Sequence, residues 1–229
     1  MKIIIFSDTH LSHKFDVRKY NFLKRIISES DRVIINGDFW DRYRTTFDKF
    51  VSSEWKKLFP LFLKKKTVYI HGNHDPEELC NDRMQLFSVI NSESYEFRAD
   101  GHSFIVHHGD RIVEQNKPRI IKFYGIVMGF ISKINVERFI QRIFRITIRI
   151  GYWILGADFM TTTSISKNNN RVMKNSHDPA TGKWQVCSDT HCSELDAENL
   201  FINTGCILYG WGSYLLIDGT NIKLIKEKY

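Results

Sequence analysis

Residues 2–10 read Lys-Ile-Ile-Ile-Phe-Ser-Asp-Thr-His, an apolar run that gives way at once to polar side chains. A short apolar run such as Lys2–Phe6 is typical of a buried β-strand. Asp8 and His10 follow directly after this strand. Open α/β sheets bind ligands at the carboxyl ends of their strands, so the stretch predicts both a central strand and a candidate site at its end.

The same order of strand and polar cluster recurs along the first half of the chain. Further strands are expected at Arg32–Ile35 and Val68–Ile70, and amphipathic helices at Val17–Ser28 and Thr46–Phe59. The clusters after the two strands are Gly37-Asp38 and Gly72-Asn73-His74-Asp75. Alternation of strand and helix is the signature of an α/β fold.

The second half is expected to be mostly sheet, after a helix near Asp82–Ile90. Its strands are expected at Ser94–Arg98, Ser103–His107, Trp184–Cys187, Leu200–Asn203, Tyr214–Asp218 and Ile222–Lys226. Asp218-Gly219-Thr220-Asn221 between the last two predicts a hairpin turn, because Asp-Gly supports positive φ angles. Two more polar clusters follow strands, His107-His108-Gly109-Asp110 and Asp189-Thr190-His191. The tetrapeptide Ser-Asp-Thr-His occurs at 7–10 and at 188–191, but four residues recur by chance often enough that this alone proves nothing.

Each cluster taken singly has an ordinary structural explanation. Asp8 would cap a turn, Asn73 would support one, and a lone histidine after a strand is more often structural than a ligand. Together the clusters place oxygen and nitrogen donors at five strand ends, several of them beside glycines that let the backbone approach closely. Such a donor set suits a pair of divalent cations.

These motifs resemble the calcineurin-like metallophosphoesterase superfamily. The matching segments are Asp8-x-His10, Gly37-Asp38, Gly72-Asn73-His74-Asp75, His108-Gly109-Asp110 and a degenerate Gly-His-x-His at 188–191, in the family's order. The resemblance implies a four-layer α/β/β/α sandwich. It also implies that Asp8, His10 and His191 hold one metal ion, that Asn73 and His108 hold a second, and that Asp38 bridges both.

The implied chemistry is hydrolysis of a phosphoester. Two cations about 3.5 to 4 Å apart lower the pKa of a shared water and neutralise charge on the phosphoryl oxygens, so a bridging hydroxide is the expected nucleophile. His74 is expected to face the phosphate as the catalytic histidine, with Asp75 orienting it. Strand alternation sends His107 to the face opposite His108, so a buried structural role is expected for His107.

The sequence departs from the family pattern at Asp189, where the family has histidine, and at Ser188, where it has glycine. A carboxylate makes the second position harder and richer in oxygen, which favours manganese, iron or magnesium over zinc. We expect two divalent ions with manganese foremost; Asp189 either binds the second ion or leaves its position weakly held. Cys187 and Cys192 lack the spacing of a structural zinc site and are interpreted as core residues.

Length and composition favour one domain spanning 1–229, with 42% hydrophobic residues to form its core. The start of the chain has no signal-peptide pattern, and the longest uncharged stretch in the middle of the chain, at 123–132, is about half of the roughly 20 residues a membrane span needs. Four cysteines in a chain of this length do not suggest a disulfide framework. The expected location is therefore the cytoplasm, including the inner face of the membrane.

An insertion at about 117–175 interrupts the sheet segments and carries the positive charge. Residues 117–157 hold eight Lys or Arg and one Glu, so this segment has a net charge of +7. The net charge of the whole chain is also +7. Within it Arg138, Arg142, Arg145 and Arg149 fall on one helical stripe flanked by apolar residues. Three interpretations stay open: an ordinary solvated helix, a lid that meets anionic lipid headgroups, and a surface that tracks nucleic-acid phosphates.

An insertion at this place is similar to the helical lid of UDP-2,3-diacylglucosamine pyrophosphohydrolases. That branch has arginine where this chain has His74, so the central motif follows the general phosphoesterase pattern instead. The expected activity is metal-dependent hydrolysis of a phosphoester or pyrophosphate bond in a lipid-linked or nucleotide-linked substrate near a membrane surface. The alternatives are a soluble phosphodiesterase acting on nucleotides or nucleic acid, and a non-catalytic module that binds phosphate or membrane.

Overall fold

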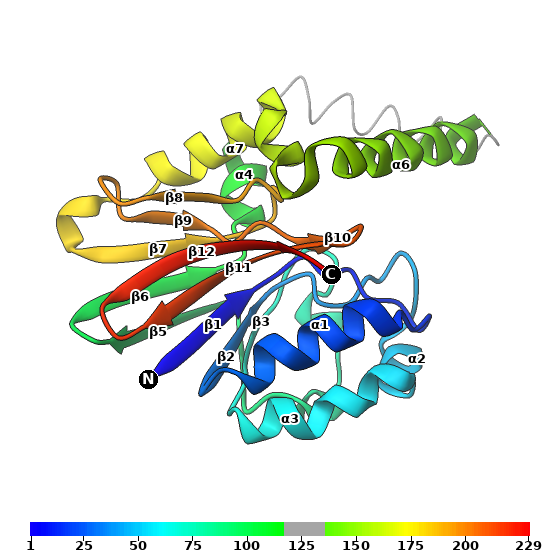
Figure 1. Ribbon diagram of the computed structural model, residues 1–229, viewed down its shortest axis with the longest axis horizontal. Coiled ribbons are helices and arrows are strands. Elements are labelled where there is room, and N and C mark those ends of the chain that lie inside the picture. The colour runs from blue at the N-terminus through cyan, green and yellow to red at the C-terminus, as the bar shows by residue number, and fades with distance from the viewer. Residues whose placement is uncertain (117–135) are drawn as a thin grey trace.

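Two stacked β-sheets with helices on both outer faces form the body of the protein (Figure 1). The computed structural model describes residues 1–116 and 136–229, and the side chains of 136–145 are outside that description. The first sheet has the order β10-β11-β1-β2-β3-β4, with β12 beside β11; the second has the order β5-β6-β7-β9-β8. These layers confirm the expected α/β/β/α sandwich.

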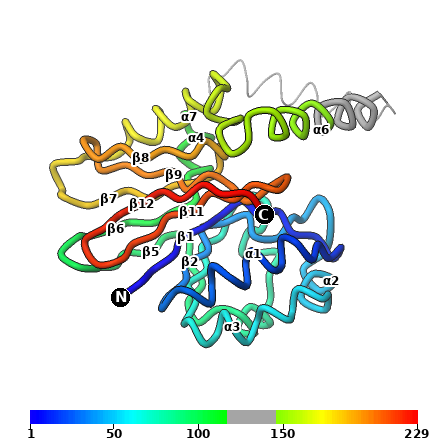
Figure 2. Tube along the Cα trace, in the orientation of Figure 1, coloured from blue at the N-terminus to red at the C-terminus, as the bar shows by residue number. Residues whose placement is uncertain are grey.

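The strand bounds follow the apolar runs closely. The first sheet contains β1 (Lys2–Phe6), β2 (Arg32–Asn36), β3 (Val68–Ile70), β4 (Ile90–Ser92), β10 (Ile207–Leu208), β11 (Trp211–Asp218) and β12 (Asn221–Lys228). The second contains β5 (Ser94–Ala99), β6 (His102–His107), β7 (Lys183–Cys187), β8 (Glu194–Asp196) and β9 (Phe201–Asn203). Figure 2 follows the chain from β1 to β12, which both lie in the first sheet.

Parallel pairing decides where the loops meet. β1, β2, β3 and β4 pair in parallel, as do β6, β7 and β9. The segments that leave the carboxyl ends of these strands therefore lie at one edge of each sheet.

The alternation of side chains along β1 explains why the run Ile3–Phe6 is apolar throughout. Ile4 and Phe6 belong to the core between the first sheet and helices α1 (Val17–Ser28) and α3 (Phe59–Lys64). Ile3 and Ile5 point the other way, into the core between the two sheets. A strand buried on both faces needs apolar residues at every position.

Two predicted helices differ from the structure. The expected helix Thr46–Phe59 is divided into α2 (Phe47–Val51), a 3₁₀ turn (Glu54–Leu58) and α3. Pro60 lies in the first turn of α3, where its missing N–H costs nothing, but it has no N–H to continue a preceding helix. The expected helix at Asp82–Ile90 is a 3₁₀ turn, Asp82–Leu86, followed by β4.

The insertion is helical wherever the structure describes it. α6 (Val136–Leu155), a 3₁₀ turn (Gly156–Thr162) and α7 (Ser164–Asn175) precede β7, and residues 117–135 lie outside the described part. α4 (Asp110–Asn116) and α7 lie on the outer face of the second sheet, where Val113 and Met173 pack with Cys187 and Phe201. The expected hairpin turn is confirmed, since Asp218 pairs with Asn221 across Gly219 and Thr220.

Candidate metal and phosphate site

Hydrogen bonds between neighbouring loops gather the predicted ligands at the carboxyl edge of both sheets. The loop after β1 is tied to the loop after β2, because His10 N donates to Asp38 O at 3.0 Å and Asp8 N donates to Gly37 O at 3.1 Å. Across the second sheet, Ser188 N donates to His108 O at 2.9 Å. The Ser188 hydroxyl joins the two sheets, because it donates to Asn36 O at 2.8 Å, so the four strand ends lie together.

The backbone at this edge is unusual. Among the described residues, nine that are not glycine have positive φ, and five of these are predicted ligands: Asp8, His10, Asp38, Asp189 and His191. A left-handed backbone is disfavoured for residues with a Cβ and persists only where the surroundings enforce it. Such residues gather at functional sites, so the strain supports a working role for these five side chains.

The two Ser-Asp-Thr-His tetrapeptides have the same backbone form. In both, the Asp and the His have positive φ: 50° and 45° at Asp8 and His10, 63° and 58° at Asp189 and His191. Each tetrapeptide leaves a strand end, β1 in one sheet and β7 in the other. The sequence coincidence is therefore a structural correspondence, and it brings the two histidines together.

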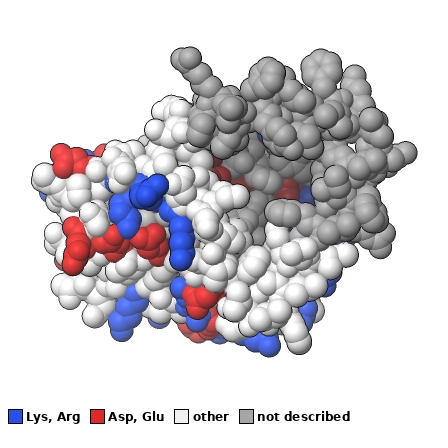
Figure 3. Space-filling view, turned by 90° about the horizontal axis from the view of Figure 1, so that it is seen from above, with Lys and Arg blue, Asp and Glu red and all other residues white. Residues whose placement is uncertain are grey.

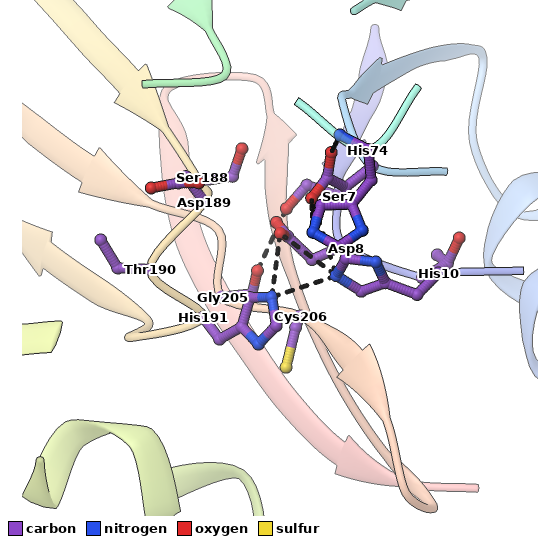
Figure 4. A network of polar contacts seen from close by, with 12 residues as sticks. Ser7, Asp8, His10, His74, Ser188, Asp189, Thr190, His191, Gly205 and Cys206 are labelled. Carbon is purple, nitrogen blue, oxygen red and sulfur yellow. Dashed lines mark hydrogen bonds and ion pairs between the residues drawn. The ribbon is translucent and has the colours of Figure 1, made fainter. Parts of the chain in front are cut away.

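Asp8, His10 and His191 form the first cluster (Figure 4). His191 Nε2 lies 3.1 Å from Asp8 Oδ1, and His10 Nε2 lies 3.2 Å from His191 Nε2 and 3.9 Å from Asp8 Oδ1. Asp8 is completely buried. One carboxylate and two imidazoles thus point their donor atoms at a common position.

Asp38, His108 and Asp189 form the second cluster. His108 Nε2 lies 3.4 Å from Asp38 Oδ1 and 3.8 Å from Asp189 Oδ1. The other ring nitrogen of His108 lies 2.8 Å from the carbonyl oxygen of Asn36, to which it donates. This hydrogen bond leaves Nε2 as the free nitrogen, an arrangement common in metal-binding histidines. Asp38 lies between the clusters, because its Oδ2 is 3.7 Å from His10 Nε2.

The loops have no room for larger residues behind these side chains. A Cβ at Gly37 would lie 2.3 Å from the His108 ring, and one at Gly72 would lie 2.4 Å from Asp38 Oδ1. Gly37 also has a φ of +81°. Both glycines are therefore required by close approach, as the sequence pattern suggested.

His74 lies at the cluster with a carboxylate partner that sequence reasoning did not identify. Its Nδ1 is 3.1 Å from Asp41 Oδ1, and its Nε2 is 4.0 Å from Asp38 Oδ2. The predicted partner, Asp75, does not orient the His74 ring. Asp41 follows Asp38 by three residues, and this closeness to a predicted ligand is the sequence feature that could have identified Asp41 as the partner of His74.

Asp75 instead holds backbone together beneath the site. It is fully buried and accepts hydrogen bonds from Gly72 N at 2.8 Å, Asp38 N at 3.0 Å and Phe39 N at 2.6 Å, and from the hydroxyl of Tyr69. Burial and the nearby Asp38 raise the pKa of Asp75 to about 6. Its role is to fix the turn that carries Asp38 and His74.

The remaining candidates lie around the clusters. Asn73 is exposed, between Gly72 and His74. His107 is half-buried on the face away from His108, 3.0 Å from Gln185 Nε2, as strand alternation predicted. The thiols of Cys187 and Cys192 are buried, and burial raises the pKa of Cys192 to about 11.

Two basic residues that sequence reasoning missed hold the first loop. Lys19 Nζ donates to Thr9 O at 2.7 Å, and Arg44 donates to His10 O at 2.8 Å. Burial lowers the pKa of Lys19 to about 7, with Arg44 adding to the effect. The two contacts span 10 and 34 residues of sequence, and no local pattern marks either of them.

The charges in the clusters fit divalent cations. Neither oxygen of Asp8, nor His108 Nε2, has a hydrogen-bond partner among the described residues, although all three atoms are buried. Burial alone raises the pKa of Asp38, but His108, His10 and His74 outweigh it and hold that pKa below its ordinary value. Three carboxylates and three imidazoles, with the unpartnered atoms of Asp8 and His108 among them, are the ligands that manganese, iron or zinc takes.

An open cleft of about 1510 Å³ runs from the clusters along helix α6. His10, Asp38, His74, Asp189 and His191 line one end. Ile146, Arg149, Ile150 and Trp153, which share one face of α6, line the other. Arg149 is the one member of the predicted arginine stripe whose side chain is described; Arg138, Arg142 and Arg145 lie on α6 outside the described side chains.

Comparison with known proteins agrees with this geometry. The sequence profile of the calcineurin-like phosphoesterases matches residues 1–139, more than half of the chain. The chain belongs to the calcineurin-like phosphoesterase family. Membership carries with it metal-dependent phosphoester hydrolysis as the family's chemistry. No protein of curated function matches the sequence.

Solved structures of similar outline are distant from this family member. A conserved predicted phosphoesterase from Streptococcus pneumoniae TIGR4 is 14% identical, with a TM-score of 0.44, over 99% of this chain and 88% of that one. Yfce, a phosphoesterase from E. coli, is 15% identical, with a TM-score of 0.45, over 98% of both chains. Zinc-bound Vps29 from Entamoeba histolytica is 11% identical, with a TM-score of 0.46, over 100% and 99%.

Metal binding by this phosphoesterase is predicted to displace protons. Burial lowers the pKa of His108 and His191, but Asp38 and Asp8 outweigh burial and raise both values above the ordinary one. Protons therefore compete with metal near neutral pH, and the apparent Kd for Mn²⁺ should rise about tenfold per pH unit for each proton displaced, as pH falls from about 8 to about 6.

Calorimetric titration with MnCl₂, in buffers of different ionisation enthalpy, measures both the Kd and the protons released. His108→Ala should weaken the binding and release fewer protons, whereas His102→Ala, which removes a histidine of β6 outside the clusters, should match the wild type. A Kd that is independent of pH, with no proton release, would contradict the assigned ligands.

Proposed function

We propose that this chain hydrolyses a phosphoester or pyrophosphate bond in a lipid-linked or nucleotide-linked substrate at a membrane surface, in the manner of the UDP-2,3-diacylglucosamine pyrophosphohydrolases. The observation that carries the proposal is the cleft, which joins a charged end at the two clusters to an apolar wall on α6. A substrate with a phosphate at one end and hydrocarbon at the other fits this polarity.

The two clusters would hold the metal ions. Asp8, His10 and His191 are the proposed ligands of one ion, His108, Asn73 and Asp189 those of the other, and Asp38 lies where it can serve both. When bound, two divalent ions would lower the pKa of a water molecule and neutralise phosphoryl charge. The carboxylate of Asp189 supports manganese, with iron or magnesium next, because oxygen donors favour harder cations.

His74 would supply the proton for the leaving oxygen. Burial lowers the pKa of His74, but its contact with Asp41 outweighs burial and raises the pKa above the ordinary value. Because Nδ1 faces Asp41, the other nitrogen carries the proton available to substrate, and His74 lines the cleft. Water oxygen forms the new bond to phosphorus, while the bond to the leaving oxygen breaks and that oxygen takes the proton from Nε2.

The α6 wall supports a lipid chain in the substrate. Ile146 and Ile150 are about half exposed and Trp153 is 84% exposed, although all three line the cleft. Large apolar side chains left open beside a charged site are typical of a ligand groove. Arg149 lies between them and would meet an anionic group of the substrate or of the lipid surface.

Membrane contact is proposed through the surface of the insertion. Among the described residues no helix is long and apolar enough to cross a membrane. Ile154, next to Trp153 on α6, and Ile165 on α7 are also mostly exposed. On the described part of the face in Figure 3, Lys and Arg side chains lie beside Asp and Glu, so the described face has no continuous basic patch of its own.

The substrate class is tested by comparing two compounds in the presence of Mn²⁺. A UDP-linked diacylglucosamine diphosphate should be turned over with a higher kcat/KM than a generic aryl phosphodiester. His74→Ala should lower kcat by about 10²- to 10⁴-fold while Mn²⁺ binding is kept. Equal turnover of both compounds would refute the lipid assignment, and a His74→Ala protein with full biological activity would favour a non-catalytic module.

Membrane association is tested by flotation with vesicles that contain anionic phospholipid. Replacing Arg138, Arg142, Arg145 and Arg149 together by glutamine should weaken vesicle binding by about 1 kcal/mol per charge removed. A smaller fraction of the protein should then float with the vesicles. The matched control carries glutamine at four exposed lysines on the opposite helical layer, Lys49, Lys56, Lys57 and Lys64. If the arginine variant and the wild type float equally well, the interfacial role of α6 is wrong.

A further inference from the structure

Asn170 on helix α7 has a buried side chain that is hydrogen-bonded to the loop after β7, to Asn203 at the end of β9 and to Glu194 of β8. The residue is 1% exposed. Its Oδ1 accepts from Thr190 Oγ1 at 2.7 Å and from Asn203 Nδ2 at 2.9 Å. Its Nδ2 donates to Cys192 O at 2.8 Å and to Glu194 Oε2 at 2.9 Å. A side-chain amide offers two donor hydrogens and two acceptor lone pairs, and here each has a partner.

These partners bracket the two candidate ligands of the loop after β7. Thr190 lies between Asp189 and His191, both of which have positive φ. Asn203 Nδ2 also lies 3.0 Å from Thr190 Oγ1 and 2.9 Å from Ser188 O, so its two hydrogens are shared among three acceptors. The loop is thus held on both sides of each strained residue, and Asn170 is the contact that comes from the insertion.

The same helix also packs on the loop that carries His108. Met173, one turn after Asn170, is fully buried. A Cβ at Gly109 would lie 2.4 Å from the sulfur of Met173. Gly109 has a φ of +106°, so the turn after His108 depends on glycine and on the methionine packed against it.

Ion pairs fix α7 to the neighbouring edge strand. Lys174 Nζ pairs with Glu194 and Asp196 of β8. In Figure 1, α7 lies over β8 and β9 on the outer face of the second sheet. α7 therefore contacts both loops that carry candidate ligands of this sheet, independently of the cleft that α6 lines.

We infer that α7 makes the insertion a part of the metal site, with Asn170 as a positioning residue that holds Asp189 and His191 in their strained, ligand-presenting conformation. This inference rests on the proposed function, because it needs the clusters to bind metal. It adds that the insertion determines metal affinity through α7 as well as contacting substrate through α6.

Loss of the Asn170 amide should weaken metal binding, because it disturbs the loop after β7 that carries Asp189 and His191. The alanine variant removes the acceptor of the Thr190 hydroxyl, the side-chain donor to Cys192 O and one of the acceptors of Asn203 Nδ2, and buried polar groups that lose a partner regain one by moving. Asp189 and His191 are then free to leave their disfavoured backbone region. Removal of groups that orient metal ligands typically weakens metal binding about 10- to 100-fold.

Three variants separate positioning from general stability. Asn170→Ala removes the amide, and Asn168→Ala removes an exposed asparagine from the same helix. Lys174→Met removes the ion pairs to β8 and keeps Asn170. Calorimetric titration of the whole chain with MnCl₂ alone gives the stoichiometry and the Kd, and the thermal midpoint of the metal-free protein measures stability.

We expect Asn170→Ala to bind Mn²⁺ about 10- to 100-fold more weakly, or to bind one ion fewer. Asn168→Ala should match the wild type, and Lys174→Met should lose thermal stability while keeping its Kd. If Asn170→Ala does not fold, Thr190→Val, which keeps the shape but loses the hydroxyl, should give the same weakening. Wild-type affinity in Asn170→Ala or in Thr190→Val overturns the inference, whereas a wild type that binds no Mn²⁺ overturns the proposed function instead.

Discussion

Asp8 brings a carboxyl group into a completely buried position where neither oxygen accepts a hydrogen bond from the described residues. A buried carboxylate without a compensating partner costs several kcal/mol, so the surroundings must supply positive charge. His10 and His191 approach it from strand ends in different sheets. Asp38 is a second buried carboxylate close by, with His108 beside it. A pair of divalent cations would compensate both carboxylates at once, and both positions exist only because the two sheets stack with these strand ends together.

The strained backbone around this charge occurs in loops of both sheets. Two loops of identical sequence adopt the same disfavoured backbone, one at β1 and the other at β7. Each is held by a buried polar side chain from a neighbouring helix, Lys19 of α1 for the first and Asn170 of α7 for the second. The site is therefore supported from both outer layers of the sandwich.

Local sequence patterns predict several of the strands and helices and most of the residues of the candidate site. The bounds of β1, α1 and β3 agree with the apolar runs, because a buried strand or an amphipathic helix shows its period in sequence. Asp8, His10, Asp38, His108 and His191 are brought together because each follows a parallel strand. The divided helix at Thr46–Phe59 was missed although Pro60 lay within one residue of the expected end.

Local sequence patterns do not predict which side chains meet when the chain folds. Asp75 is the sequence neighbour of His74, yet its carboxylate turns to backbone N–H groups, and Asp41 takes the place beside the imidazole. Asn170 looked like one residue of a polar run. Only the packing of α7 against the loop after β7 shows what it does.

The central claim is that these clusters hold two ions, and anomalous scattering from a crystal of the manganese-loaded protein tests it most directly. We predict two peaks, one in contact with Asp8, His10 and His191, the other with His108, Asn73 and Asp189, and Asp38 in contact with both. A single peak, or a second peak from which Asp189 is turned away, would contradict the account.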